Sequence, residues 1–469
     1  MNRFGRIKIT LLLIVTAFCL SESVLSRQND LFRQLEAAIP SIQPPMLFCQ
    51  MVWLIALFCF KFSLNDLPLI GMVLITMAAN LIDVRPNADA INFLTGVIMG
   101  KGTALLLGQE SEIRRRKSEG GNTFHLNNRQ PAVSNFLIGV ALLLTFGSWL
   151  HLNVTDNFYH GPRWMGIWDT PNIYGMLMSV GVVLVIGMAV QMWKAEGGTR
   201  KDENGKEMRI AHGGWRNSLG QWKLIILLVL TFMMGMGLLF SYSRGPWLGT
   251  LVGLLYLAKF YGKFKWRYIL PGIVIVAVTV CCFWNTPRTS PWYFQRLDLG
   301  RGSAQNRVVA WKAGFDIMYA HPLGVGWNNT VTTYQEIYSP PGDSAFAITT
   351  NDYLMLGTQL GIPALLCFIT YVVLCFGARN WWRKKSPPTE DYGFTTSDPK
   401  LRTPHSALRT KLACRAAALS LLVAFWFDSG LFKLATASIF WILLELGRED
   451  LPQQNVIENN PVLPANSVL

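Results

Sequence analysis

The sequence predicts an all-α, polytopic integral membrane protein with about twelve transmembrane helices and one large outer loop. Three observations predict this class. The 469 residues are 51% hydrophobic, and their mean hydropathy is +0.29. Runs of about twenty apolar residues, the length that crosses a bilayer, recur along the chain. The lysines and arginines gather in the short segments between those runs.

The apolar runs define the candidate spans. They cover residues 7–25, 46–62, 66–83, 90–108, 132–152, 172–193, 222–240, 246–260, 267–285, 352–376, 411–427 and 430–446. The first run follows Arg3, Arg6 and Lys8 and resembles a signal peptide. No small-residue cleavage site follows convincingly, so we interpret it as a retained span. The fourth span is the weakest, because Lys101 lies inside it.

Four basic loops orient these spans. Their charges are Arg114, Arg115, Arg116 and Lys117; Lys194, Arg200, Lys201, Lys206, Arg209 and Arg216; Lys259, Lys263, Lys265 and Arg267; and Arg379, Arg383, Lys384, Lys385, Lys400, Arg402 and Arg409. If every span crosses once, all four loops lie on one side. The positive-inside rule makes that side the cytoplasm, which both termini then share.

The resulting organisation places the first nine spans in residues 1–285 and a large outer, periplasmic loop at 286–351. The last three spans lie in 352–446, with a cytoplasmic linker at 379–410, and a cytoplasmic tail covers 447–469. The large loop is the one outer segment of this topology that is long enough to build a site.

Composition also excludes some classes of protein. The net charge of +14 could indicate a nucleic-acid partner, but no stretch interleaves basic and aromatic residues in a soluble domain. We therefore expect a lipid bilayer and no nucleic acid as partners. The eight cysteines lie in or at the edge of apolar runs. This placement predicts no disulfide framework and no metal site, and no motif indicates a cofactor.

The most informative segment is 241–249, which places Arg244 at the outer mouth of a span. A charge at such a place is costly to keep unless it is used. An arginine that merely reaches to the interface is the plain alternative. The neighbouring Gly245, Pro246 and Gly249 favour function, because they let a ligand approach the backbone. The guanidinium group suits phosphate oxygens.

A second outer segment enters the sixth span at Thr170, Pro171 and Asn172. Thr170 suits the N-cap and Pro171 the first helical position. One interpretation is simply a well-capped helix. The other is that Asn172 and the free N–H groups of this helix end face an anionic ligand.

Residues 303–318 of the large loop predict an amphipathic helix on the outer surface. Val308, Trp311, Phe315 and Met318 form its apolar stripe. Arg307 lies four residues before Trp311 and shares its face, which gives the outer side a second arginine for a diphosphate. A purely structural lid is the alternative.

Candidate proton-transfer groups are fewer. His321 begins the turn 321–326, where Pro322 ends the preceding helix, and it serves either as a capping group or as a base. Glu336, Asp343 and Asp352 are acids on the same outer side.

The order of these motifs resembles the O-antigen ligase and O-antigen polymerase family of bacterial envelope proteins. The matching pieces are Gly166 to Asn172, Ser243 to Gly249, Arg307 with Trp311, His321 to Gly326, Asn351 to Leu354 and Leu360 to Pro363. The resemblance covers about 160–375 and outside that region rests on topology.

The resemblance implies a metal-independent glycosyltransferase of the bacterial inner membrane. Such proteins move a glycan from undecaprenyl diphosphate to a lipid A core, another glycan or a protein. By this resemblance Arg244 and Arg307 hold the diphosphate. Asn172, Trp311 and Asn351 are then substrate-binding candidates, and His321 and Asp352 are catalytic candidates.

One position departs from the family. A histidine usually precedes the asparagine at the start of the span after the large loop, where this chain has Thr350 before Asn351. Either a neighbour replaces the histidine, or the acceptor differs, or the protein is an inactive member of an envelope assembly. A transporter or flippase of lipid-linked sugars is the rival from another class. Such a protein should carry charges and broken helices in mid-span.

Overall fold

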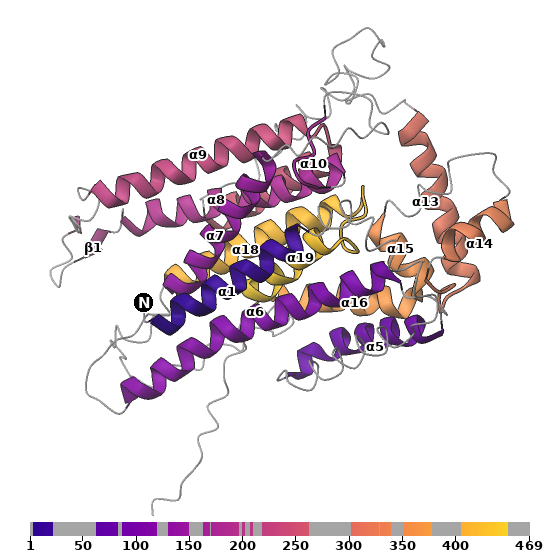
Figure 1. Ribbon diagram of the computed structural model, residues 1–469, viewed down its shortest axis with the longest axis horizontal. Coiled ribbons are helices and arrows are strands. Elements are labelled where there is room, and N and C mark those ends of the chain that lie inside the picture. The colour runs from indigo at the N-terminus through magenta and orange to yellow at the C-terminus, as the bar shows by residue number, and fades with distance from the viewer. Residues whose placement is uncertain are drawn as a thin grey trace, which may run out of the picture.

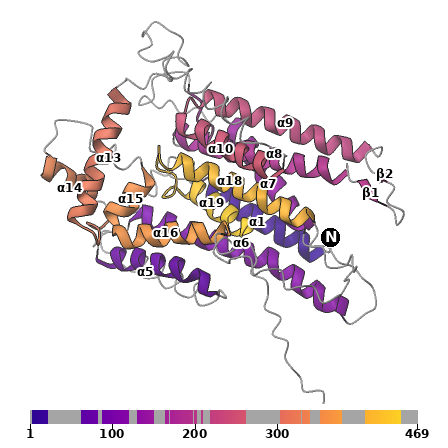
Figure 2. The same ribbon diagram turned by 180° about the vertical axis from the view of Figure 1, so that it is seen from behind.

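The computed structural model describes residues 3–21, 62–82, 87–119, 130–149, 163–168, 170–196, 199–201, 207–209, 218–261, 302–327, 329–338, 351–377 and 405–448. Within these residues the protein is helical apart from one short antiparallel hairpin, in which Thr199 pairs with Arg209. The all-α prediction is therefore confirmed for the described part of the chain. Long helices run roughly side by side, and the helices at residues 302–320 and 329–338 lie across one end of the bundle (Figures 1 and 2).

The elements in chain order are α1 (Arg3–Leu20), η1 (Leu64–Asp66), α5 (Leu67–Ile82), α6 (Ala88–Glu119), α7 (Gln130–Trp149), α8 (Pro171–Glu196), β1 (Thr199–Lys201), β2 (Glu207–Arg209), α9 (Ser218–Phe240), α10 (Arg244–Tyr261), α13 (Gly302–Ala320), α14 (Asn329–Tyr338), α15 (Asp352–Gln359), α16 (Gly361–Cys375), α18 (His405–Ala424) and α19 (Leu434–Gly447). Nine of the predicted spans each coincide with one described helix. The predicted span 267–285, and 46–61 of the predicted span 46–62, lie outside the described residues.

The span predicted at 352–376 is not one helix, and this part of the prediction is wrong. Leu360 ends α15, and Gly361 starts α16 with a φ of +88°. A side chain at Gly361 would also meet Leu323, since a Cβ there would lie 2.5 Å from the Leu323 carbonyl carbon. The break lets the turn after α13 dock against it, because Pro322 accepts a hydrogen bond of 2.9 Å from the Ile362 amide. Glycine makes both the turn and the close approach possible.

Three described helical stretches are long and apolar enough to cross a membrane: Ala88–Leu107, Ala132–Trp149 and Pro171–Val190. Five described helical stretches are apolar but shorter: Ile7–Leu20, Leu64–Ala79, Ile225–Phe240, Gly361–Cys375 and Leu434–Gly447. Helix α9 leaves large apolar side chains uncovered, such as Trp222 at 63% and Phe232 at 68% exposure. Exposed side chains of this kind are expected where lipid replaces water.

A cluster of aromatic side chains lies at one end of the exposed apolar surface of α9. Trp164 stacks on Phe240 at 4.5 Å and lies edge-on to Trp149 at 5.7 Å. Trp222 lies 18 residues before Phe240, so about 27 Å of helix separates the two aromatic levels. That separation is close to the hydrocarbon thickness of a bilayer, about 30 Å, and aromatic side chains favour its two boundaries.

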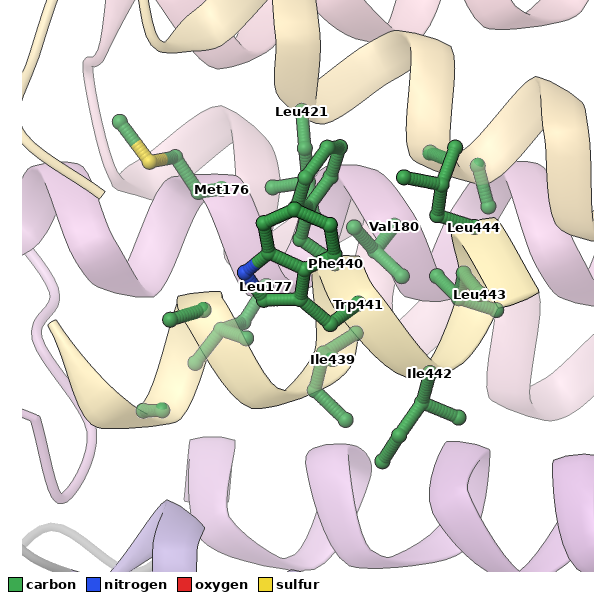
Figure 3. Close-up of a cluster of buried hydrophobic side chains, with 14 of the residues drawn as sticks. Met176, Leu177, Val180, Leu421, Ile439, Phe440, Trp441, Ile442, Leu443 and Leu444 are labelled. Carbon is green, nitrogen blue, oxygen red and sulfur yellow. The ribbon is translucent and has the colours of Figure 1, made fainter. Parts of the chain in front are cut away.

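The core lies where α8, α18 and α19 meet. Figure 3 shows Leu177 and Val180 of α8, Leu421 of α18, and Phe440 and Trp441 of α19 in one apolar cluster. All five side chains are fully or almost fully buried. This centre holds the three helices together, and the candidate site lies at one end of them.

Helix α10 packs very closely on α18, and its glycines explain why. Gly245, Gly249 and Gly253 recur every four residues along one face. A Cβ on Gly253 would lie 2.9 Å from the Ala416 carbonyl oxygen, and one on Gly249 would overlap the Ser420 carbonyl. A Cβ on Gly245 would come within 2.8 Å of Phe427. Small residues allow this approach in membrane helices, and here they fix the start of α10, where Arg244 stands.

Lys101, which made the fourth span look weak, is part of a paired cluster. Its ammonium lies 2.6 Å from Asp66 and 3.0 Å from Glu445. Arg448 contacts Asp66 at 2.6 Å, and the Tyr371 hydroxyl donates to Glu445. Two cations and two anions thus neutralise one another at the C-terminal end of α19, and Lys101 does not interrupt α6.

Candidate functional site

The site begins at the tight turn between α9 and α10. Tyr242 adopts a φ of +49°, a left-handed conformation that costs free energy for a residue with a side chain. The Ser241 hydroxyl donates to Leu238 at 2.7 Å, and the Ser243 amide donates to that hydroxyl at 3.3 Å. The turn is therefore held by its own hydrogen bonds, and it ends directly before Arg244, the first residue of α10.

Arg163 ties this turn to the start of α8. Its Nε donates to the Ser241 carbonyl at 2.9 Å, and one Nη donates to Asn172 Oδ1 at 2.6 Å and to Ser243 Oγ at 2.8 Å. Ser243 also hydrogen bonds to Asn172. The planar guanidinium with several donors suits such a junction better than an ammonium group. Sequence reasoning missed Arg163, which stands in an irregular connector and reaches residues about 80 positions away.

The predicted start of α8 is confirmed. The helix begins at Pro171, and the Thr170 hydroxyl accepts a hydrogen bond of 3.2 Å from the Ile173 amide. This cap sets Asn172 in the first turn, where it meets Arg163 and Ser243. Asn172 is thus part of the site and not only of a helix end.

Asp428 is the acid that the sequence did not reveal. It lies in the loop 425–433 between α18 and α19, where its carboxylate accepts from the Ser429 amide at 3.0 Å. Burial raises the pKa of Asp428 to about 6, and the attraction of Arg307 and Arg163, together with a hydrogen bond from Asn172, keeps the pKa from rising further. Asp428 therefore lies within electrostatic reach of Arg307 of α13 and of Arg163, which precedes α8.

Two consecutive residues of α15 fasten it to the end of α18 and to that loop. The Asp352 amide donates to Phe425 at 3.0 Å, and its Oδ2 accepts from the amides of Gly430 and Leu431 at 2.8 and 2.9 Å. The Tyr353 hydroxyl donates to Leu422 at 2.6 Å. The Asp352 side chain is 1% exposed. In the structure, this predicted catalytic acid holds the segment that carries Asp428 in place.

Asn351 is fully buried and caps α15, because its side chain accepts from the amides of Tyr353 and Leu354 at 3.0 and 3.1 Å. Its Nδ2 and the Asp352 Oδ1 have no hydrogen-bond partner among the described residues. Asn351 therefore has a structural role as the N-cap of α15, and its substrate-binding role stays a prediction.

Aromatic side chains join α13 to the α18–α19 loop. Trp311 contacts Trp426 edge-on at 5.6 Å and Phe427 at 6.4 Å, and Trp426 contacts Tyr353 at 5.5 Å. The Trp311 indole N–H has no hydrogen-bond partner among the described residues. Trp311 therefore brings α13 into contact with the α18–α19 loop, and its substrate-binding role stays a prediction.

The predicted apolar stripe of α13 is partly wrong. Val308 and Phe315 are 62% and 53% exposed, and the buried stripe is instead Ala310, Ala313 and Ile317. The reason is close packing on α15, since a Cβ on Gly314 would lie 3.2 Å from Leu354. A face that approaches its neighbour so closely needs small side chains. Trp311 lies beside this face and contacts Trp426 of the α18–α19 loop.

The other predicted residues are not brought to this point. His321 is exposed and follows the last turn of α13, about 20 Å along the helix axis from Arg307. Its amide donates to Ile317 at 2.8 Å and its carbonyl accepts from Gly324 at 2.9 Å, as in a helix-terminating turn. Glu336 is exposed on α14, and Asp343 and Thr350 lie outside the described residues.

Among the residues that the structure describes, histidine, cysteine, aspartate and glutamate side chains do not form a group of three that could hold a metal ion. The described cysteines Cys19, Cys367, Cys375 and Cys414 are free thiols.

The fold and this site define a class: a helical, membrane-associated protein with an arginine-rich, partly buried site at one end of the bundle. Residues 229–369 match the model of the O-antigen ligase family. The matched region runs from α9 into α16, inside the region 160–375 predicted from the motifs, and confirms that resemblance. It contains Arg244, Arg307 and Asp352, whereas Arg163 and Asp428 lie outside it.

This match supports a glycosyltransferase-like role in surface polysaccharide biosynthesis at a bacterial membrane. No curated protein matches the chain.

Proposed function

We propose that this protein transfers a glycan from undecaprenyl diphosphate to an acceptor at the periplasmic face of the inner membrane. The acceptor is a lipid A core, another glycan chain or a protein. One observation carries the proposal: Arg163 donates hydrogen bonds to Asn172 at the start of α8 and to Ser243 directly before Arg244, and Arg163 and Arg307 both exert an attraction on the nearby Asp428. Cations fixed by tertiary structure at a membrane boundary suit a lipid-linked diphosphate.

Arg244 and Arg307 serve as the diphosphate clamp in this proposal. When the bond between the sugar C1 and the diphosphate oxygen breaks, the electron pair leaves with the diphosphate. The negative charge that develops there is stabilised by positioned donors, which commonly supply the largest single contribution to catalysis. The N-terminal end of α8, with Asn172 in its first turn, adds N–H dipoles of the same sign.

Asp428 serves as the general base and takes the place of the family histidine that Thr350 replaces. The acceptor hydroxyl oxygen bonds to C1, and its proton passes to the Asp428 carboxylate. A pKa of about 6 leaves most of this carboxylate ionised at pH 7 and close to the value that suits proton transfer at that pH. Asp352 and Tyr353 contribute by holding the loop in place.

The proposed sidedness rests on the basic loops and on the arrangement of the helices. The beginning of α1 lies at the end of the bundle away from α13 (Figures 1 and 2). With α13 in the periplasm, this end lies in the cytoplasm, where we also place both termini and the tail 447–469. The twelve-span topology includes the segments 46–62 and 267–285 as spans.

The rival interpretation, a transporter or flippase of lipid-linked sugars, has less support. Lys101, which lies well inside the fourth predicted span, is paired with Asp66 and Glu445. Of the buried polar atoms that have no partner among the described residues, those of Trp311, Asn351 and Asp352 belong to α13 and to the start of α15, whereas those of Thr103 and Trp441 lie within α6 and α19. A site at one end of the bundle favours chemistry at the membrane surface over passage through it.

A reconstituted transfer assay tests the proposal. Purified protein in liposomes receives an undecaprenyl-diphosphate oligosaccharide with and without lipid A core, and mass spectrometry identifies the products. Glycan on the core identifies a ligase, and a longer lipid-linked glycan identifies a polymerase. An unchanged donor with every acceptor class, including a protein acceptor, would contradict the proposal and return the inactive or transport interpretations.

A further inference from the structure

The loop between α18 and α19 carries two consecutive aromatic residues, Trp426 and Phe427, directly before Asp428. Both aromatic side chains are half-buried, so part of each is open to the outside of the fold. Sites for small ligands are lined largely by aromatic and apolar side chains, with a few polar groups among them. The function proposed above gives neither aromatic residue a role.

Phe427 joins the two segments that carry the proposed clamp arginines. On one side it packs on the start of α10, because a Cβ on Gly245 would lie 2.8 Å from the Phe427 Cβ, and Gly245 follows Arg244 directly. On the other side its ring contacts Trp311 of α13, with 6.4 Å between the ring centroids, and Trp311 lies about one helical turn after Arg307. A diphosphate that binds to both arginines is therefore close to Phe427.

Trp426 is held in one orientation by two further rings. Trp311 meets it edge-on at 5.6 Å, and Tyr353 of α15 lies against it at 5.5 Å with the ring planes tilted by 42°. The Tyr353 ring is itself fixed, because its hydroxyl donates to the Leu422 carbonyl at 2.6 Å. The half-buried Trp426 ring is thus in position before a ligand arrives, which lowers the entropic cost of binding.

We propose that Trp426 and Phe427 form a sugar-binding platform for the first sugar of the lipid-linked donor. This inference rests on the proposed function, because it concerns the sugar that is bonded to the clamped diphosphate. A pyranose ring presents C–H groups on its faces, and their small positive charge suits the negative face of an aromatic ring. Aromatic side chains also supply a large contact area at a low cost in conformational entropy.

The platform is consistent with the place of Asp428, which follows Phe427 directly. A sugar on the rings lies beside the carboxylate proposed as the base, so the sugar C1 and the incoming acceptor hydroxyl meet near that carboxylate. Stacking acts on C–H faces that many pyranoses share. The platform therefore contributes affinity for several sugars and does not by itself select one pattern of hydroxyl groups.

Calorimetry with two kinds of lipid diphosphate separates the sugar contribution from the diphosphate contribution. Purified protein in nanodiscs is titrated with farnesyl diphosphate methyl ester, and with farnesyl diphosphates that carry glucose, galactose or N-acetylglucosamine and have the same charge as the methyl ester. Trp426→Leu removes the ring but keeps an apolar side chain, and Trp426→Phe keeps an aromatic ring. Phe315→Leu is the matched control, because it removes a ring that is 53% exposed on the outer face of α13.

We expect wild type and Phe315→Leu to bind at least one sugar-bearing probe about two- to tenfold more tightly than the methyl ester. Trp426→Leu should lose this difference while its affinity for the methyl ester stays unchanged, and Trp426→Phe should keep most of the difference. A difference that persists in Trp426→Leu, an equal weakening of both kinds of probe, or no difference in wild type would overturn the platform. No binding of the methyl ester to wild type would overturn the clamp, and the platform with it.

Discussion

Replacing Asp428 with asparagine tests the proposed base with little change in shape. The substitution removes the proton acceptor but keeps an oxygen for the Ser429 amide, which now lies 3.0 Å from the carboxylate. A general base contributes about 10²–10⁴-fold, so we expect the rate of transfer by Asp428→Asn to fall by that factor. The wild-type rate should rise with pH through about 6, and the variant should lose this dependence.

Stability distinguishes this loss from misfolding. The pKa of Asp428 rises from 3.8 to about 6 on folding, so the fold favours the neutral acid. Its stabilising contribution is present below pH 3.8 and is lost as the pH rises through 6. A rise of about two units corresponds to about 3 kcal/mol at pH 7, and the partial exposure of the side chain reduces this value. A permanently neutral asparagine should therefore not lower the melting temperature at pH 7.

The assay is single-turnover transfer in liposomes between pH 5 and 8, with thermal unfolding of the same samples. Asp316→Asn provides the control, since Asp316 is an exposed acid on α13. Wild-type rates and an unchanged pH profile in Asp428→Asn would refute the reasoning. A large fall in melting temperature would refute the electrostatic argument.

Three further predictions concern the supports of the site and of the bundle. Arg163→Lys keeps the charge but removes the guanidinium hydrogen bonds to Ser241, Asn172 and Ser243. The rate of transfer should therefore fall about tenfold or more at unchanged protein yield. An unchanged rate would show that Arg163 is not part of the site. Gly249→Leu forces α10 away from Ser420 and should destabilise the protein by about 1–3 kcal/mol or more, measured by thermal unfolding. Gly235→Leu is the control, because a Cβ at Gly235 meets nothing within 4 Å, and it should leave the melting temperature unchanged. Lys101→Met removes the ammonium group that contacts both Asp66 and Glu445 and should lower the free energy of unfolding by about 3 kcal/mol. Lys312→Met, at an exposed lysine, should leave it unchanged. Equal melting temperatures for the two variants would show that the cluster does not stabilise the fold.

The elements that the sequence predicts well are those with a local cause. Thr170 and Pro171 carry a capping pattern that needs no tertiary contact, and α8 begins there. The apolar runs likewise predict α6, α7 and α9, because burial in lipid acts on each segment alone. In these cases the residue types within a short window decide the structure.

The residues that sequence reasoning missed depend on distant partners. Arg163 acts through Ser241 and Ser243, and Asp428 occupies a short gap between two predicted spans. Nothing in either window distinguishes them from an ordinary loop charge. The face of α13 was misjudged because its packing on α15 selects alanine over the larger apolar residues. Such choices follow from the distance between two helices, which no single segment encodes.

The central claim is that an arginine clamp holds the diphosphate of the donor, and Arg307→Ala tests it most directly. The variant should insert and fold normally but lose transfer by about 10²–10³-fold or more, because one positioned donor to the leaving group is missing. Lys312→Ala removes an exposed cation from the same helix and should transfer at the wild-type rate. Wild-type transfer by purified Arg307→Ala, or an equal loss in Lys312→Ala, would contradict the account.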